Sequence, residues 1–284
     1  MKIFALFLQS AGMFILSFGV LTIFSVSGNP EAFSDSHAVS PVVIQKSLLR
    51  ASAISSENTA PSPLPTPQKI TIAPPQAPKC FPKTTFPTEY PQVQKTIERV
   101  SRAIPCTLLT SLQTVSVFQD DEKRFPRALS GASLLKIRED AIADPRFSDV
   151  ILHEMGHIVD LGGLVGDAES GESAFKDGSQ AIYKNDISLL FYSISWTNEK
   201  TRKSEVTDFD FVGGYAASDP FEDFAESFLY YIRHGNEFRL LSAKNTLIQE
   251  KYNFFKNFVF EGKEFESGKT DVNTAERPWD ITKY

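Results

Sequence analysis

Apolar and polar positions divide the 284-residue chain into three regions. Residues 1–28 contain an almost wholly apolar stretch from position 3 to position 26. Residues 29–79 are rich in Ser, Ala and Pro, a composition that cannot bury a core and favours extended conformations. From residue 80 onward, apolar residues recur with the periods of helices and strands. We therefore expect a disordered linker over 29–79 and one folded domain over 80–284.

The order of patterns in the folded region predicts an α+β fold, mostly helical with a small mixed sheet. Strand patterns cover residues 114–118 and, after a predicted turn at Ser130-Gly131, residues 133–137. The segment 164–212 has an apolar centre that the pattern does not assign to an element, and the polar tail beyond Lys263 is expected to be loosely ordered. Helical patterns cover residues 89–103, 144–161, a stretch beginning at 219, and 237–260.

The helix predicted from Asp144 has signals at both ends. Asp144 is an acidic N-cap residue, and Pro145 occupies the first turn, where a missing N–H costs nothing. Gly162-Gly163 ends the run, as glycine commonly does at a helix C-terminus. Between these signals the apolar residues follow helical spacing: Phe147, Val150, Ile151, Met155, Ile158, Val159 and Leu161.

The apolar stretch over 3–26 is long enough to span a bilayer as a helix and longer than the apolar part of a usual signal peptide. We expect an uncleaved membrane anchor; cleavage after Ser27, which would release a secreted protein, is the alternative. Lys2 precedes the stretch, and Glu31 and Asp35 follow it, so the positive-inside rule places the N-terminus in the cytoplasm. The folded domain is then extracytoplasmic.

Charge and cysteine content narrow the class of protein. The formal net charge is −6 and the basic residues form no stripe, which argues against nucleic-acid binding. The two cysteines, Cys80 and Cys106, bracket the helical pattern over 89–103. Outside the cytoplasm we expect them to form a disulfide, with two buried free thiols as the alternative.

Two of the four histidines fall in one HExxH motif, His153-Glu154-Met155-Gly156-His157. Helix positions four residues apart share a face, so His153 and His157 can bind one metal ion. Glu154 then lies where it can hold and deprotonate a metal-bound water as a general base. This arrangement is typical of zincin metallopeptidases and predicts one catalytic Zn²⁺ ion. Two structural histidines are the alternative, but burying them on an apolar helix without partners would be costly.

The strand predicted over 133–137 precedes this helix. In zincins a strand in this place commonly borders the cleft and pairs with an extended substrate. Residues 134–137 are expected in that role, with a simple interior or edge strand as the alternative.

A catalytic zinc site needs a third protein ligand. Metzincins place it six residues after the second histidine, where this chain has Gly163, so that class is excluded. Glu222 is a better candidate, because Asp219-Pro220 starts a helix on which Glu222 and Glu226 share one face. Glu226 would accept a hydrogen bond from a zinc-bound histidine and fix its tautomer. From the residues alone, Glu222 could instead complete a capping box, and other acids stay open as ligands: Asp160, Asp167, Glu169, Glu172 and Asp223.

The sequence HEMGHIVD followed by GYAASDPFEDFAESF resembles the gluzincin metallopeptidases of the anthrax lethal factor and Pro-Pro endopeptidase group. That group has a Tyr-x6-Glu-x3-Glu pattern after its HExxH helix, and Tyr215, Glu222 and Glu226 reproduce the spacing. The resemblance implies that Glu222 is the third zinc ligand, that Tyr215 stabilises the oxyanion and that Glu226 supports a ligand from behind. It implies a zincin topology over 85–260. The segment 164–212 departs from the pattern and leaves substrate specificity open.

These features predict a zinc-dependent endopeptidase that hydrolyses peptide bonds of extracytoplasmic protein substrates. We expect a monomer with no nucleic-acid partner. A catalytically inactive zincin-like domain that binds peptide or cell-wall partners is the alternative, although the intact Glu154 argues against it; a structural domain without metal is a third reading. His234, before Gly235, is expected to be a helix-end residue rather than a ligand.

Overall fold

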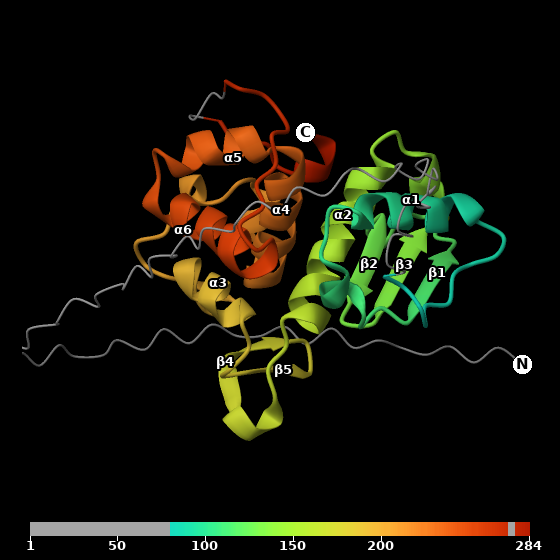
Figure 1. Ribbon diagram of the computed structural model, residues 1–284, viewed down its shortest axis with the longest axis horizontal. Helices are drawn as coiled ribbons and strands as arrows, with labels where there is room; N and C mark the ends of the chain where they lie inside the picture. The colour runs from blue at the N-terminus through green and yellow to red at the C-terminus, as the bar shows by residue number, and fades with distance from the viewer. Residues whose placement is uncertain (1–79, 272–275) are drawn as a thin grey trace, which may run out of the picture. The chain divides into compact units, whose positions relative to one another are not determined.

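The computed structural model describes residues 80–271 and 276–284. The predicted membrane anchor in residues 1–28 and the predicted linker over 29–79 lie outside these residues. No helix in the described part of the chain is both long and apolar enough to cross a membrane. The described residues form an α+β fold of α-helices and small sheets, as the sequence predicts (Figure 1).

The largest sheet has three short strands in the order β1-β3-β2: β1 (Thr114–Phe118), β2 (Ala128–Gly131) and β3 (Leu134–Arg138). The central strand β3 is parallel to β1 and antiparallel to β2. The predicted turn at Ser130-Gly131 is wrong, because these residues pair with β3 and end β2; sheet pairing overrides their local turn preference. The sheet edge nearest the HExxH helix is therefore β2, and residues 134–137 form an interior strand.

Helix α2 (Phe147–Ile158) lies between this sheet and a group of helices, and it contacts both β2 and α4 (Figure 1). Every residue from Val150 to Ile158 is buried. The HExxH motif is therefore held by packing on two sides. The remaining α-helices are α1 (Pro91–Ser101), α3 (Ser188–Ser195), α4 (Pro220–Arg233), α5 (Gly235–Ser242) and α6 (Thr246–Phe254).

The prediction of a single helix over 237–260 is wrong. The helix is interrupted at residues 243–245, between α5 and α6. There the Asn245 side chain accepts the backbone N–H of Ile248 at 2.9 Å and caps α6. A π-helical turn, Phe255–Val259, follows α6. The break is invisible in the apolar pattern because both short helices pack on one core.

The segment 164–212 is an integral part of the domain. It contains the hairpin β4 (Glu172–Asp177) and β5 (Gln180–Tyr183), helix α3, and the hairpin β6 (Trp196–Asn198) and β7 (Thr201–Arg202). Trp196 Nε1 donates a hydrogen bond to Asp223 of α4 at 3.1 Å, and Lys251 of α6 lies 2.7 Å from the same carboxylate. All three side chains are buried, so this polar cluster ties the segment to α4 and α6.

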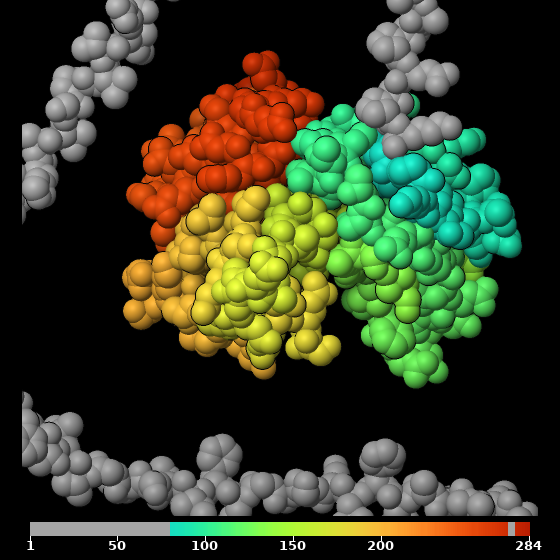
Figure 2. All heavy atoms as spheres, turned by 60° about the horizontal axis from the view of Figure 1, so that its bottom comes forward, coloured from blue at the N-terminus to red at the C-terminus, as the bar shows by residue number. Residues whose placement is uncertain are grey.

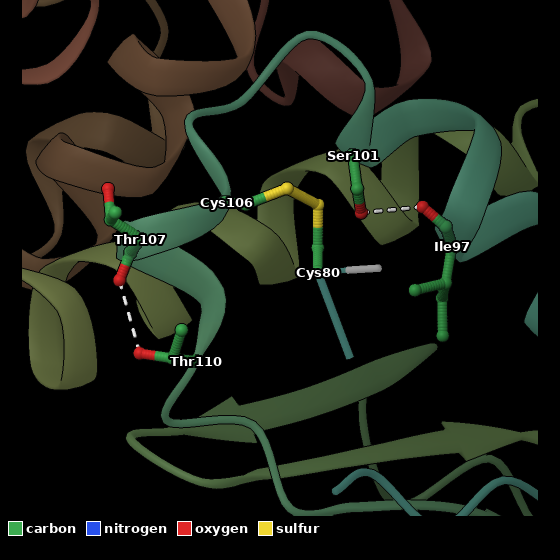
Figure 3. The surroundings of a disulfide bond; sticks show 6 residues. All are labelled: Cys80, Ile97, Ser101, Cys106, Thr107 and Thr110. Carbon is green, nitrogen blue, oxygen red and sulfur yellow. Dashed lines mark hydrogen bonds between the residues drawn. A yellow bond between two sulfur atoms is a disulfide. The ribbon is translucent and has the colours of Figure 1, made fainter. Parts of the chain in front are cut away.

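Cys80 and Cys106 are joined by a disulfide that encloses α1 (Figure 3). Their Cα atoms are 4.8 Å apart, and 26 positions separate them along the chain. Beside them, Ser101 Oγ donates a hydrogen bond to the Ile97 carbonyl at 2.6 Å. Because the disulfide closes a loop in the unfolded chain, it stabilises the start of the domain.

Candidate metal site

The helix that carries the HExxH motif begins at Phe147, later than predicted, and Asp144 is not its N-cap. Asp144 instead forms a turn before the helix: its Oδ1 accepts the Arg146 N–H at 2.8 Å, and its carbonyl accepts the Phe147 N–H at 2.9 Å. The α-helix ends at Ile158, and a π-helical turn, Val159–Gly163, extends it to the predicted end. The error concerns the first turn and leaves both histidines on one face.

Gly156, inside the motif, sets the distance between α2 and α4. A Cβ atom at this position would lie 2.9 Å from Ala225 Cα, closer than real Cβ atoms approach. Glycine therefore allows α4 to pack directly against the motif. This close packing brings Glu222 and Glu226, on either side of Ala225, to the histidines.

Three ligand atoms converge between α2 and α4: His153 Nε2, His157 Nε2 and Glu222 Oε2. The carboxylate oxygen is 3.1 Å from the first nitrogen and 3.5 Å from the second. All three atoms lie within 4.8 Å of one another, and no other group of His, Cys, Asp or Glu in the described residues is placed to hold a metal in this way. The structure thus brings together the three residues predicted as ligands.

Glu222 Oε2 is buried and, although close to both rings, accepts no hydrogen bond of suitable geometry from the described part of the chain. A buried carboxylate oxygen needs a cationic or hydrogen-bonding neighbour, and the nearest groups here are the two imidazole nitrogens. Two imidazole nitrogens and one carboxylate oxygen form a ligand set of catalytic zinc sites, which keep a further position open. The residues present therefore fit a zinc ion.

The same contacts shift the titration of all three groups. Burial lowers the pKa of His153, but Glu222 and Glu226 outweigh burial and raise this pKa well above its usual value. Burial likewise lowers the pKa of His157, and Glu222 reverses the effect. Burial raises the pKa of Glu222, yet its contacts with the two histidines hold it far below its usual range. A divalent cation would therefore displace protons on binding.

Glu226 contacts the nitrogen of His153 that does not face the metal site. It is fully buried, and its Oε1 lies 3.1 Å from His153 Nδ1. Its other oxygen, Oε2, accepts the backbone N–H of Ile281 at 2.8 Å. Because a carboxylate oxygen accepts hydrogen bonds, this contact places the ring proton on Nδ1 and leaves Nε2 free for a metal. The contact with Ile281 also shows that the tail beyond Lys263, expected to be loosely ordered, contributes to the site.

Tyr215 lies at the opposite end of the Glu222 carboxylate. Its hydroxyl donates a hydrogen bond to Glu222 Oε1 at 3.0 Å, and its ring stacks near His153 with centroids 6.2 Å apart. Burial, followed by the negative charge of Glu222, raises the pKa of the Tyr215 phenol above its usual value, so the phenol stays a proton donor. Asp219 caps α4 through the N–H groups of Phe221 and Glu222, at 3.0 and 2.9 Å. The Glu222 side chain is thus directed to the histidines and Tyr215.

Glu154 has a partner that sequence reasoning missed. Ser130 Oγ on β2 lies 2.5 Å from Glu154 Oε2 and 3.1 Å from the Glu154 carbonyl oxygen. The hydroxyl donates to the carboxylate and holds it at the edge of the sheet. No sequence signal marks Ser130, since it lies on a different element and resembles a turn residue. Trp279 and Ile281 had one available signal, as apolar residues in an otherwise polar tail.

The other acids that the sequence left open as metal ligands lie outside the group formed with the two histidine nitrogens, and most have partners of their own. Asp160 accepts hydrogen bonds from Tyr192 Oη at 2.6 and 2.7 Å. Asp223 is paired with Lys251, and Asp167 caps a short 3₁₀ turn that contains Glu169. Glu172 lies 3.3 Å from Lys176 on β4. His234 lies between α4 and α5, with Nδ1 3.2 Å from Glu237, so the structure places it at a helix end.

The site opens into a cleft of about 620 Å³. Figure 2 shows the surface hollowed between the yellow part of the chain, which includes the β4–β5 hairpin, and the green part, which includes the three-stranded sheet. The cleft lining combines the metal site with β2, the hairpin end at Asp177 and four C-terminal residues, Trp279, Asp280, Thr282 and Lys283. A groove along a sheet edge can hold an extended peptide.

Comparison of the chain with protein-family models, with curated proteins and with solved structures finds no match.

Proposed function

We propose that this chain is a zinc-dependent endopeptidase of the gluzincin type. The observation that carries the proposal is the position of Glu222 Oε2. This buried oxygen accepts no hydrogen bond of suitable geometry and lies beside His153 Nε2 and His157 Nε2 of the HExxH motif. The spacing of Tyr215, Glu222 and Glu226 shared with the lethal factor and Pro-Pro endopeptidase group supports the same function. The edge strand β2 beside the motif is in keeping with a zincin topology.

A zinc ion held by His153, His157 and Glu222 would polarise the scissile carbonyl and acidify water at the site. Glu154 takes the proton of the attacking water and returns it to the leaving amine. Ser130 keeps the Glu154 carboxylate in place during both transfers.

Two further residues support this chemistry. The Tyr215 hydroxyl is protonated and donates to Glu222 in this structure. During the reaction it would give up that hydrogen bond and donate to the developing oxyanion instead. Glu226 keeps the proton of His153 on Nδ1 and so orients the ring.

The proposed substrates are peptides or proteins outside the cytoplasmic membrane, cleaved by a monomer. Residues 3–26 would anchor the domain to the membrane, or cleavage near Ser27 would release it. The disulfide between Cys80 and Cys106 is in keeping with an oxidising compartment. Protease accessibility of the tagged C-terminus in intact cells tests this location, and protection by an intact membrane would contradict it.

The test of function uses purified protein, zinc analysis and a library of internally quenched peptides. Wild type is expected to bind one zinc and to cleave library members, with loss of cleavage on chelation. Glu154→Gln should keep zinc and lose hydrolysis, whereas Glu250→Gln, the same change at an exposed site, should keep both. Cleavage by the Glu154→Gln protein at the wild-type rate would refute the mechanism.

A binding function without catalysis is the second candidate, and a structural domain without metal is the third. A protein that binds one zinc and captures peptides, yet cleaves no library member, would favour the binding function. A protein that binds no zinc would favour the structural domain. The contact between Ser130 and Glu154 argues against both, because positioning a general base serves neither.

A further inference from the structure

Trp279 is the most exposed large hydrophobic side chain in the described residues, with 70% of its surface accessible. It nevertheless lines the cleft that contains His153, Glu154 and Tyr215. An exposed indole forgoes the hydrophobic stabilisation that burial would give. Most of the indole surface is therefore available to a ligand in the cleft.

The backbone around Trp279 is held firmly against the site. Gly214 N–H donates to the Pro278 carbonyl at 2.9 Å, and Tyr215 N–H donates to the Trp279 carbonyl at 2.6 Å. A Cβ atom on Gly214 would overlap the indole ring, so glycine at this position lets the ring pack against the chain just before Tyr215. The indole thus lies against Gly214, one residue before the proposed oxyanion donor Tyr215.

The chain after Trp279 is anchored on both sides of the cleft. Ile281 N–H donates to Glu226 on α4 at 2.8 Å, and Arg127, just before β2, lies 3.1 Å from Asp280. These contacts hold the chain that carries the indole on both sides of the cleft. A rigid aromatic group loses little conformational entropy when a ligand covers it.

The cationic side chains that line the cleft, Lys283 included, already have acidic partners within the domain. The two arginines that line the cleft are already paired within the domain, Arg127 with Asp144 and Asp280, and Arg138 with Asp140. A second accessible apolar side chain, Leu129, lines the same cleft from the edge strand β2 and is 39% exposed. An apolar ligand group can therefore be covered here without breaking an arginine ion pair.

We propose that Trp279 is a specificity-determining residue that binds an apolar or aromatic side chain of the peptide substrate close to the scissile bond. This proposal rests on the proposed peptidase function. Covering the indole with a substrate side chain removes apolar surface of both partners from water. Substrates with an apolar residue at that subsite are thus selected over those with an acidic one.

Kinetics with the peptide library test the role in catalysis. Trp279→Ala should raise KM for apolar substrates about tenfold, leave kcat within a few-fold of wild type and flatten the library preference. Trp279→Phe should restore most of the preference, and both variants should bind zinc as wild type does. An unchanged library preference in Trp279→Ala would overturn the proposal.

Tryptophan emission tests binding even if no peptide is cleaved. The chain has two tryptophans, and Trp196 is buried at 2% exposure, so a blue shift on peptide binding reports Trp279. Zinc-loaded Glu154→Gln protein is titrated with two hexapeptides that differ only in a central Phe or Asp. We expect a saturable blue shift with the Phe peptide alone, and its loss when Trp279→Phe is added. Equal emission changes for both peptides, or none for either, would overturn the proposal, whereas absent cleavage by wild type would overturn the peptidase function.

Discussion

Replacing Glu226 by Gln is expected to weaken zinc binding although the side chain keeps its size. Glu226 is fully buried, and its two oxygens have separate partners, His153 Nδ1 at 3.1 Å and Ile281 N–H at 2.8 Å. Both partners donate toward the carboxylate. An amide has one oxygen, so in either orientation its NH₂ group faces one of the two donors.

The magnitude follows from this count of donors and acceptors. Each amide orientation breaks one buried hydrogen bond and leaves a donor unsatisfied, at a cost of about 1–3 kcal/mol. A cost on the His153 side appears as lost zinc affinity, for which about 10- to 100-fold is typical of groups behind a ligand. A cost on the Ile281 side appears as a weaker hold on the C-terminal segment and a lower melting temperature. One of the two measurements must therefore change.

Zinc affinity is measured by competition with a chelating dye, and the stability of zinc-free protein by thermal unfolding. Glu250→Gln makes the same chemical change at an exposed position of α6 and should leave both quantities unchanged. If Glu226→Gln matches wild type in zinc affinity and in melting temperature, the role assigned to Glu226 is wrong.

Three further predictions concern other contacts. Ser130→Ala should lower kcat by roughly 3- to 10-fold with zinc affinity unchanged, because Glu154 loses a hydrogen bond; steady-state kinetics in which Ser130→Thr is no better than Ser130→Ala would contradict this. Lys251→Met leaves Asp223 buried without its counter-charge and should lower the free energy of unfolding by about 3–5 kcal/mol in urea denaturation; an unchanged midpoint would refute the account. Burial raises the pKa of Asp160 from 3.8 to about 7, so the stability due to its proton is present below pH 4 and is lost as the pH rises through 7. Between pH 5 and pH 8, zinc-free wild type should thus lose about 2–3 kcal/mol relative to Asp160→Asn, and a constant difference would exclude this titration.

The parts of the site that sequence could predict are those encoded within a single helix. His153 and His157 are four residues apart on α2, and Glu222 and Glu226 are four apart on α4, so helical geometry alone puts each pair on one face. Helical spacing could not predict the distance between α2 and α4. It depends on Gly156 packing against α4, a contact that involves two separate elements.

The missed parts all cross between elements distant in sequence. Ser130 reaches Glu154 only because two residues that resemble a turn pair into β2. Ile281 contacts Glu226 because the C-terminal tail folds back to the site. No periodic pattern in the sequence predicts this. Local propensity carries no information on such contacts, which form only when the whole domain packs.

The choice of the third ligand shows what the fold adds to composition. Helix spacing favoured Glu222 as the third ligand, but Asp160 and Asp223 stayed open as rivals on composition alone. In the fold, Tyr192 donates to Asp160 and Lys251 pairs with Asp223, so two of the three carboxylates have internal partners. Glu222 alone of these keeps a buried oxygen without a hydrogen bond, and that oxygen faces two imidazole nitrogens. Of the three carboxylates, Glu222 is therefore the one placed to serve as the proposed third ligand.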